Sequence, residues 1–528
     1  MSRILILTGT LSYSVRKGIA ALMTHLPGAQ FMIVVHQPKK SLAQLVRSQW
    51  RNLKRNGWRW IPYQVGDVVE RVGARLRAGD SDAAAGLGAG FSAEAIGRAA
   101  RLVRVSDIHG EPTRAQMQEF APDLGISLAA PILKPSVFAL PRLGTLNLHK
   151  GKVPDFRGMP PAFWELWRDE KEVGCTVHKV EAGLDTGAVV LESSIPVRPH
   201  STLRGLQYTL DEVGVRLMTQ AARAVLEGRA DVSPQRPGGE TFRKPTLAQQ
   251  EILRRRRAPR TQASARSLAK NALFLGYAGL ATPLPRRVRG WRGSQRVVVL
   301  LYHRVNDDMR DSLTIGIEQF DRQMNLLARR CRVVDIRDVV AGRVTRDTPR
   351  PIVAVTFDDG YRDNYDNAFP VLLRNRVPAA FFVSTGKISV DGAFDHDLRR
   401  IGHGLPTMTW EQLREMQAAG FTIGSHSVSH LDCGTASLEQ VRAELRESRT
   451  TLATELGLDQ LIFAYPFGGR QNMTPQALEV VRAEGYAGCL SAYGGRNEGP
   501  IDPFNVCRLG ISYNFSEWSF RARLEGWC

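Results

Sequence analysis

Two short stretches in the second half of the chain carry residues that could bind a metal ion. An apolar run at 353–357 ends in the adjacent carboxylates Asp358 and Asp359, followed by a glycine. This pattern predicts a buried strand closed by a turn, which puts both acids at the carboxyl end of a strand. Another β-prone run ends at His426, with His430 four residues later, a spacing that puts both imidazoles on one face of a helical turn. Neighbouring carboxylates repel each other unless a positive group, such as a metal ion, lies beside them. Two histidines and one aspartate would bind a divalent metal and leave it open positions for water and substrate.

A different set of polar residues lies in the first half of the chain. Asn147 and His149 alternate at a predicted strand end, and Asp185 lies in a later Gly-Leu-Asp-Thr-Gly loop. These residue types supply what acyl transfer to an amine requires. A neutral imidazole takes the amine proton, an amide stabilises the oxyanion, and a carboxylate holds the imidazole or shuttles the proton. Each is unremarkable by itself, since Asn-x-His is common and Asp-Thr-Gly is usually a turn.

The elements around these residues indicate α/β domains. The chain opens with a strand at 4–7, a helical stretch through residue 23 and a strand at 31–35, which predicts a doubly wound sheet. Its glycines do not form GxGxxG, so a nicotinamide cofactor is disfavoured. Residues 203–226 predict an amphipathic helix that covers this sheet. The apolar run at 297–302 predicts a buried parallel strand that ends at His303.

The length of the chain and its distribution of charge indicate how its domains are organised. At 528 residues it is too long for one core, and roughly two to four domains are expected. The net charge is +19, and more than half of that excess lies between residues 251 and 296, which hold twelve Lys or Arg and one acid. A basic connector of this kind suits anionic lipid head groups or an acidic partner better than base reading, so no nucleic-acid partner is expected. A basic stretch at 38–101, with three tryptophans, reveals no function, and a packed insertion helix is favoured there over stacking on bases.

The cysteines and the N-terminal residues indicate the compartment. The six cysteines show no CxxC pairing and no regular spacing, which favours free thiols in a reducing cytosol. Residues 1–9 lack the long apolar core and cleavage site of a secretory signal, so we expect a cytoplasmic protein. An uncharged stretch at 271–285 is flanked by arginines and falls short of the about 20 residues that span a bilayer. The connector is therefore either a peripheral contact for the inner face of the membrane or a solvated linker with one packed helix.

Residues 297–528 resemble the NodB-type polysaccharide deacetylase family. The resemblance rests on Thr-Phe-Asp-Asp-Gly at 356–360, His-Ser-Val-Ser-His at 426–430 and Phe-Ala-Tyr-Pro-Phe-Gly at 463–468. It implies a distorted barrel of parallel strands and helices, with Asp358 as general base. The metal ligands that it implies are Asp359, His426 and His430. Zinc is the default metal, although these ligands also suit cobalt, nickel or manganese.

Two departures from the family pattern concern the groups around the base. Ala464 stands where the family often has an arginine that holds the base, and Arg508 is a candidate replacement, with a surface arginine beside a strand as the alternative. No histidine follows His430, so the late acid histidine of the family is missing. His303 resembles the acid histidine of permuted family members, in which it comes first in sequence. The alternative is a strand-end histidine held by a backbone carbonyl.

Residues 1–245 resemble the folate-dependent formyltransferase family, most clearly from 122 to 192, where a Pro-x-x-Arg-Gly segment separates the polar residues. The resemblance implies 10-formyltetrahydrofolate as formyl donor and places Ile132 and Leu133 at the pteridine pocket. Lys-Gly-Lys at 150–152 replaces the frequent Pro-Ser-Leu of the family, which leaves the acceptor open. The implied catalytic trio is Asn147, His149 and Asp185.

Together these patterns predict a bifunctional enzyme with a formyltransferase-like doubly wound domain at 1–245, a basic connector at 246–296 and a deacetylase-like barrel at 297–528. We expect an N-acyl amino sugar, linked to a nucleotide or a lipid, as its substrate. The expected reactions are formyl transfer to an amine and hydrolysis of an acetyl or formyl amide, in an order that stays open. The rival is a regulatory scaffold that binds sugar or folate without turnover.

Overall fold

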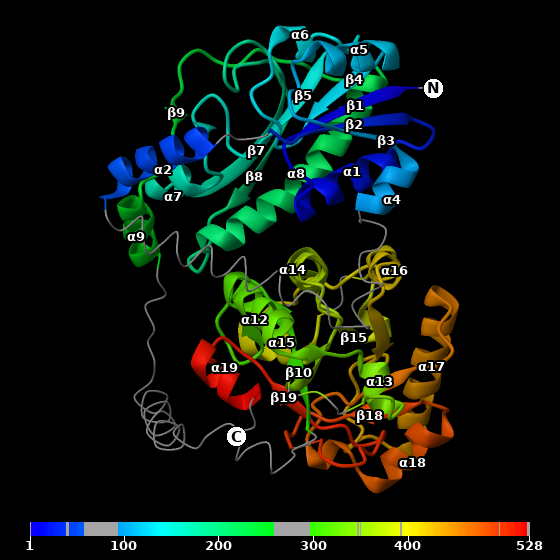
Figure 1. The fold of residues 1–528 in the computed structure, drawn as a ribbon. Helices are drawn as coiled ribbons and strands as arrows, with labels where there is room; N and C mark the ends of the chain where they lie inside the picture. The colour runs from blue at the N-terminus through cyan, green and yellow to red at the C-terminus, as the bar shows by residue number, and fades with distance from the viewer. Residues whose placement is uncertain are drawn as a thin grey trace. The chain divides into compact units, whose positions relative to one another are not determined.

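The computed structural model of the chain forms two compact units, which we describe separately (Figure 1). Among the described residues, the first unit comprises those up to 257 and the second those from 296. Most of the predicted connector, from 258 to 295, and two of the three tryptophans at 38–101 lie outside the described residues. The structure describes residues 2–38, 42–57, 93–257, 296–345, 348, 350–390, 393–495 and 497–524.

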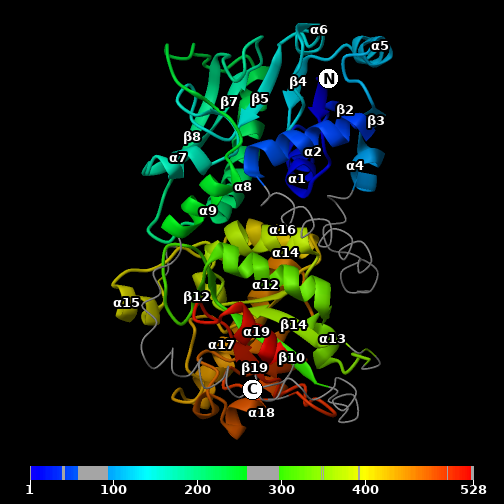
Figure 2. The ribbon, with the colours of Figure 1, turned by 60° about the vertical axis from the view of Figure 1, so that its left-hand side comes forward.

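The first unit is built on a seven-stranded sheet in the order β3-β2-β1-β4-β5-β7-β8 (Figure 2). The first five of these strands run parallel, whereas β7 pairs antiparallel with both β5 and β8. The predicted strands at 4–7 and 31–35 correspond to β1 and β2. The strands are β1 (Arg3–Thr8), β2 (Gln30–His36), β3 (Arg101–Val105), β4 (Leu124–Ser127), β5 (Thr145–His149), β7 (Glu172–Lys179) and β8 (Val189–Pro196).

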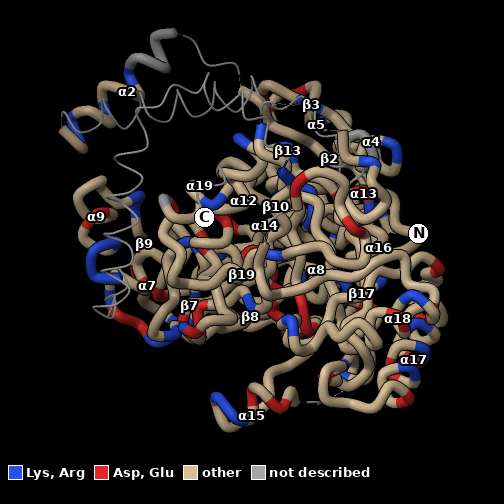
Figure 3. Tube along the Cα trace, turned by 90° about the horizontal axis from the view of Figure 1, so that it is seen from below, with Lys and Arg blue, Asp and Glu red and all other residues tan. Residues whose placement is uncertain are grey.

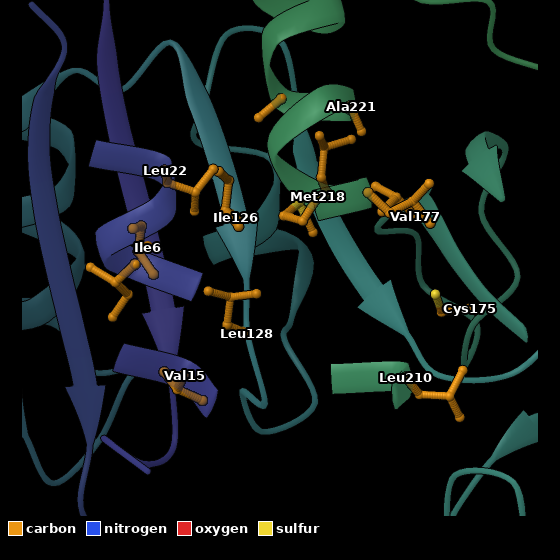
Figure 4. Packing of buried hydrophobic residues seen from close by; sticks show 14 of the residues in the cluster. Ile6, Val15, Leu22, Ile126, Leu128, Cys175, Val177, Leu210, Met218 and Ala221 are labelled. Atoms are coloured by element: carbon orange, nitrogen blue, oxygen red, sulfur yellow. The ribbon is translucent and has the colours of Figure 1, made fainter. Parts of the chain in front are cut away.

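The helices of the first unit are α1 (Tyr13–His25), α2 (Leu42–Asn56), α4 (Ala93–Ala99), α5 (Glu111–Phe120), α6 (Pro135–Phe138), α7 (Phe163–Trp167), α8 (Leu203–Leu226) and α9 (Leu247–Arg256). In β1, Ile4 and Ile6 join a hydrophobic cluster with α1 and α8 (Figure 4), whereas Leu5 and Leu7 join another with α5 and α6. Because successive side chains of a strand point to opposite faces, both faces of the sheet are covered, as a doubly wound fold requires. The fold predicted for this unit is confirmed.

A short sheet and α9 complete the first unit. β6 (Arg157–Gly158) pairs with β9 (Thr241–Phe242). A capping box between Thr246 and Gln249 fixes the start of α9. Leu253 of α9 is buried in the cluster that α1 and α8 share. Residues 246–257, which the sequence assigns to the connector, therefore pack on this unit.

The second unit is a nearly closed ring of parallel strands in the order β18-β17-β16-β15-β14-β10-β19, with β13 beside β14. A parallel bridge between Leu490 of β18 and Val506, just before β19, brings the two edges of the sheet together. This is the distorted barrel that the sequence predicts. The strands are β10 (Val297–Tyr302), β13 (Arg332–Val333), β14 (Ile352–Phe357), β15 (Ala380–Val383), β16 (Thr422–Ser425), β17 (Ile462–Ala464), β18 (Gly488–Leu490) and β19 (Arg508–Gly510), and a separate pair is formed by β11 (Arg304–Val305) and β12 (Thr314–Ile315).

Apolar side chains fill the interior of the barrel. One buried cluster takes members from β10, β14, β15, β17 and β18. Polar groups therefore gather at the strand ends instead, where parallel barrels place their chemistry. No helix in the described part of either unit is long and apolar enough to cross a membrane. The helices are α12 (Ile317–Arg330), α13 (Ile336–Val340), α14 (Phe369–Asn375), α15 (Asp395–Ile401), α16 (Trp410–Ala418), α17 (Leu438–Leu456), α18 (Pro475–Ala483) and α19 (Glu517–Leu524), with single turns at η4 (Asn364–Ala368), η5 (Thr385–Lys387) and η6 (Arg470–Asn472).

Candidate active sites

The carboxyl ends of three barrel strands supply one polar site in the second unit. β10 ends before His303, β14 before Asp358 and Asp359, and β16 before His426. Because the strands are parallel, these ends lie at the same edge of the barrel. The backbone N–H of Asp358 donates to the carbonyl of Tyr302 at 3.1 Å and ties the first two ends together.

Asp359, His426 and His430 have the geometry of metal ligands. Oδ1 of Asp359 lies 3.4 Å from Nε2 of each histidine, and the three ligand atoms lie within 4.8 Å of one another. Such separations suit a cation held by bonds of about 2.0–2.2 Å. Asp359 is 1% exposed, yet neither of its carboxylate oxygens has a hydrogen-bond partner among the described residues. Buried oxygens without partners, faced by two imidazoles, fit a divalent metal.

The surroundings keep Asp359 ionised and orient His426. Burial raises the pKa of the Asp359 carboxyl, but the nearby histidines outweigh burial, and the pKa lies well below its usual value. Nδ1 of His426 donates to the carbonyl of Ala464 at 2.8 Å, which leaves Nε2 as the basic nitrogen that faces Asp359. Ala464 thus serves the site through its backbone, although it lacks the side chain found in the family.

The two histidines converge from a loop. Residues 426–430 are not helical, and Ser427 and His430 have positive φ angles of 63° and 70°. The hydroxyl of Ser427 accepts hydrogen bonds from the backbone N–H groups of His430 and Leu431, both at 3.0 Å. The expectation of a helical turn is therefore wrong, because left-handed backbone interrupts it. Both imidazoles nevertheless reach Asp359.

Arg508 holds the other carboxylate. It begins β19, is 1% exposed, and its Nη1 and Nη2 donate to the two oxygens of Asp358 at 2.6 and 2.7 Å. Its Nε donates to the carbonyl of Ser491 at 2.7 Å. This bidentate pair fixes the plane of the Asp358 carboxylate. The alternative of a surface arginine is wrong, and Arg508 supplies the cation that Ala464 lacks.

His303 stands beside the two carboxylates. Burial lowers the pKa of its imidazole, while the charges of Asp359 and Asp358 oppose that shift. Its backbone carbonyl accepts from Nδ2 of Asn364 at 2.7 Å, but its ring makes no hydrogen bond within the described ranges. An imidazole held by a backbone carbonyl is therefore not observed, and the ring remains available to a ligand.

His396 of α15 also lies at this site, although no sequence motif indicates it. Nε2 of His396 lies 3.8 Å from Oδ2 of Asp359 and 2.8 Å from the hydroxyl of Tyr361. That hydroxyl donates to Asp397 at 2.7 Å, and the other oxygen of Asp397 accepts from Arg304 at 2.6 Å. His396 belongs to none of the motifs that carry the family resemblance, so only the fold brings it to the cluster.

The first unit brings its own trio together at the end of β5. Oδ2 of Asp185 lies 3.3 Å from Nδ1 of His149, and Nδ2 of Asn147 donates to Oδ1 of Asp185 at 3.5 Å. The backbone N–H of Gly158 also donates to Asp185, at 3.1 Å. Nε2 of His149 donates to the carbonyl of Phe156 at 2.6 Å. A carbonyl only accepts, so Nδ1 is the basic nitrogen of His149.

Burial and the neighbouring charges set the protonation of this trio. Burial lowers the pKa of His149 below its ordinary value, although Asp185 opposes the shift. Burial raises the pKa of Asp185, but His178 and His149 outweigh burial, and that pKa is lowered. A neutral imidazole therefore faces an ionised carboxylate. This arrangement suits a general base, because Asp185 stabilises the proton that His149 gains.

His178 completes the group, and no pattern in the sequence indicates it. It lies opposite Asn147 in the antiparallel pair of β5 and β7, and its Nε2 accepts from Nδ2 of Asn147 at 3.2 Å. Its Nδ1 donates to the carbonyl of Lys179 at 2.8 Å, which fixes Nε2 as the acceptor. The two side chains are 31 positions apart, and only the strand register joins them.

A cavity of about 660 Å³ opens onto the trio. Its walls include the trio, His178, Ile132 and Leu133. Leu133 is buried, whereas Ile132 is 79% exposed. Lys150 and Asp211, which form an ion pair, also line the cavity. Mostly apolar walls with a few converging polar groups are typical of a cofactor pocket.

Comparisons with known proteins match the two units to two families. Residues 94–222 match the family described as formyl transferase, and residues 345–488 match the family described as polysaccharide deacetylase, which confirms both resemblances. A methionyl-tRNA formyltransferase from Chlorobium luteolum is 33% identical over 135 residues, 26% of this chain and 43% of that protein. The chain thus spans less than half the length of the curated relatives it matches.

Solved structures include a neighbour of each unit. IcaB from Ammonifex degensii is 27% identical, with a TM-score of 0.36, and the match covers 44% of this chain and 96% of that chain. A sugar N-formyltransferase from a Shewanella species is 15% identical, with a TM-score of 0.32, and the match covers 48% of this chain and 87% of that chain.

Removing Arg508 should destabilise the second unit, because it leaves the buried Asp358 carboxylate without its cation. We expect Arg508→Met to lower the free energy of unfolding by about 3–5 kcal/mol, measured by denaturant titration. Arg343→Met is the matched control, since Arg343 is 63% exposed and pairs with Asp338 at 2.8 Å; it should cost less than about 1 kcal/mol. Adding Asp358→Asn to Arg508→Met should recover part of the loss. Equal destabilisation by Arg508→Met and Arg343→Met would contradict the assignment.

The protonation of His149 predicts how the rate of formyl transfer depends on pH. If the neutral form of His149 is the base, formyl transfer loses rate as pH falls through the pKa of His149, which lies below its ordinary value of 6.5. Asp185→Asn removes the charge that raises this pKa, so the acid limb should move to still lower pH while the rate drops by about 10²- to 10⁴-fold. The readout is the pH profile of kcat/KM, with the exposed Asp231→Asn as control. An acid limb that stays in place in Asp185→Asn would count against the pairing.

Proposed function

We propose that this chain, in which a formyltransferase domain is joined to a polysaccharide deacetylase domain, is a bifunctional enzyme acting on the amine of an amino sugar. The deacetylase domain would hydrolyse an N-acyl amide, and the formyltransferase domain would place a formyl group on an amine. The observation that carries the proposal is that each proposed base lies beside a group that can orient it. Asp358 has Arg508, and His149 has Asp185.

In the deacetylase domain, Asp359, His426 and His430 would hold one divalent metal, zinc by default, with cobalt, nickel or manganese as alternatives. When bound, the metal would polarise the amide carbonyl and lower the pKa of a water molecule. Asp358 takes a proton from the attacking water as its oxygen bonds to the amide carbon. His303 donates a proton to the amide nitrogen as the carbon–nitrogen bond breaks, which yields a free amine and a carboxylic acid.

In the formyltransferase domain, the cavity at the trio would take 10-formyltetrahydrofolate, with Ile132 and Leu133 against the pteridine. The amine attacks the formyl carbon, and Nδ1 of His149 takes the amine proton. The hydrogen that Asn147 shares with Asp185 at 3.5 Å is weakly held, so it is available to the formyl oxygen as charge develops there. The bond from the formyl carbon to N10 then breaks, N10 takes the proton that His149 had gained, and tetrahydrofolate leaves.

The acceptor that we favour is an amino sugar linked to a nucleotide or a lipid. The curated relatives are methionyl-tRNA formyltransferases, so methionyl-tRNA is the competing acceptor. An amino sugar is favoured because deacetylation of a sugar amide creates a free amine, which formyl transfer consumes. Formylated folate is a cytoplasmic co-substrate, so we place both steps in the cytoplasm or at the inner face of the membrane.

Two orders of reaction are chemically sensible. The deacetylase domain could remove an acetyl group that the other domain replaces with formyl, or it could remove a formyl group that served as a temporary mask. Acetyl and formyl differ by one methyl group, and a pocket discriminates such a difference by only about 1–3 kcal/mol. We favour acetyl removal first, because it is the simpler use of a deacetylase site.

The competing proposal of a scaffold without turnover depends on the missing motif arginine and the relocated histidine. Arg508 provides a bidentate cation for Asp358, and His303 lies near the same carboxylate with its ring unengaged in the described part of the chain. Both observations support an enzyme over a scaffold.

We also propose that the basic connector at 246–296 attaches the enzyme to an anionic membrane face. Residues 251–296 hold twelve Lys or Arg and a single acid, and an uncharged stretch at 271–285 lies among them. A short apolar stretch gives marginal insertion, and each basic residue near the surface adds about 1 kcal/mol of attraction.

Metal analysis tests the proposed ligands. The purified full chain should carry about one equivalent of divalent metal, and a His426→Ala, His430→Ala double variant should lose most of it, because two of three ligands are gone. His403→Ala is the matched control, since His403 is an exposed histidine of the same domain. Titration of the metal-free chain with zinc, cobalt, nickel and manganese then ranks the metals. Full occupancy in the double variant would refute the ligand set.

Product masses test the reaction sequence. The full chain is incubated with N-acetylated amino-sugar nucleotides and lipid-linked analogues, with and without 10-formyltetrahydrofolate. The relay predicts a product lighter by one CH₂ unit, free amine as the end product of His149→Ala, and unchanged substrate with Asp358→Asn. Hydrolysis of formyl but never acetyl substrates would favour the masking route. Formylation of methionyl-tRNA but of no amino sugar would overturn the proposed acceptor.

A further inference from the structure

Helix α2 of the first unit has an apolar stripe and a basic stripe. The apolar positions 42, 45, 46, 50 and 53 recur at helical spacing and share one face. The helix contains four Lys or Arg and no acid (Figure 3). These are Arg47, Arg51, Lys54 and Arg55, which share the opposite face.

The described apolar side chains of α2 are not buried in the first unit. Side chains are described for residues 47–56 of α2, and none of them is buried. None belongs to either hydrophobic cluster of this unit. Trp50 is 58% exposed, and Nζ of Lys54 lies 5.8 Å from the centre of its ring. Of the apolar positions of α2 whose side chains are described, Trp50 is thus largely exposed and Leu53 is half-buried.

A polar contact anchors the end of α2 to α9. Oδ1 of Asn56 accepts a hydrogen bond from the backbone N–H of Leu247, the first residue of α9, at 2.9 Å. The last turn of α9 holds Arg254, Arg255 and Arg256, and Ile252 is 43% exposed. Two basic helices therefore meet at one place on this unit, each with an exposed apolar side chain.

We propose that α2 is an interfacial helix that lays its apolar stripe into the head-group region of an anionic membrane. A basic face, an opposing stripe with an exposed tryptophan and no acidic residue are what such helices require. A nucleic acid would pair with the basic face but leave the apolar stripe in water. A second copy of the chain would bring two sets of like charges together. This membrane contact does not depend on either enzymatic activity, and α2 itself lies outside the connector at 246–296.

Vesicle flotation tests this inference on the full chain. The probes are vesicles of phosphatidylcholine alone or mixed with phosphatidylglycerol. Arg51→Gln, Lys54→Gln and Arg55→Gln together should lower partitioning to the anionic vesicles on the order of 100-fold. The three basic residues contribute comparable factors to membrane affinity, and these factors multiply. Trp50→Ser should lower it several-fold, and added salt should weaken binding of the unaltered chain. The matched control changes three exposed arginines elsewhere in the same unit, Arg98, Arg101 and Arg104, to glutamine.

A connector variant separates this inference from the proposed role of the connector. Arg286, Arg287 and Arg289 are changed to glutamine in an otherwise intact chain. Full binding by the triple α2 variant, or equal losses in that variant and the matched control, would overturn the role of α2, whatever the connector variant does. Failure of the unaltered chain to float with anionic vesicles would overturn both membrane contacts. Tighter binding to transfer RNA than to anionic vesicles, lost in the α2 variant, would assign the helix to nucleic acid instead.

Discussion

The buried ion pair between Asp358 and Arg508 is the constraint on which the barrel site depends. Taking two charges out of water costs several kcal/mol for each ion, and only close, fully hydrogen-bonded geometry offsets that cost. Arg508 meets this demand, with two bonds to Asp358 and a third to the carbonyl of Ser491. The guanidinium contacts both oxygens of Asp358, whereas Asp359 faces two imidazoles. The two neighbouring acids thus have different partners.

In the first unit, a backbone carbonyl and a carboxylate lie next to the proposed base His149. The carbonyl of Phe156 fixes the tautomer of His149, and burial keeps the imidazole neutral, so the lone pair on Nδ1 faces Asp185. His178 uses the same device, since the Lys179 carbonyl leaves its Nε2 as an acceptor for Asn147. Backbone carbonyls therefore set proton positions in this domain. In the barrel, the carbonyl of Ala464 does the same for His426.

Local sequence patterns predict the structural features that depend on residues close together along the chain. The strand endings at Asp358 and His426, the helix at 203–226 and the alternation in β1 follow from hydrophobic periodicity. Arg508 could not be assigned in this way, because it lies 150 positions from Asp358 and reaches it through closure of the ring. His178 and His396 depend in the same way on strand register and on the placement of α15. The helical turn at 426–430 was predicted wrongly, since spacing alone does not reveal that Ser427 and His430 adopt left-handed backbone.

The order of the parts along the barrel bears on how the protein is made. β10, which ends just before His303, is the first strand of the ring in sequence, and β19, which carries Arg508, is the last strand and lies beside it. A ribosome adding roughly 5–20 residues per second needs about 8–30 s to pass from Asp358 to Arg508. Throughout that interval the nascent barrel has its acid pair but not its guanidinium. The barrel site therefore forms only after synthesis has reached β19, whereas the first unit is already complete when β10 emerges.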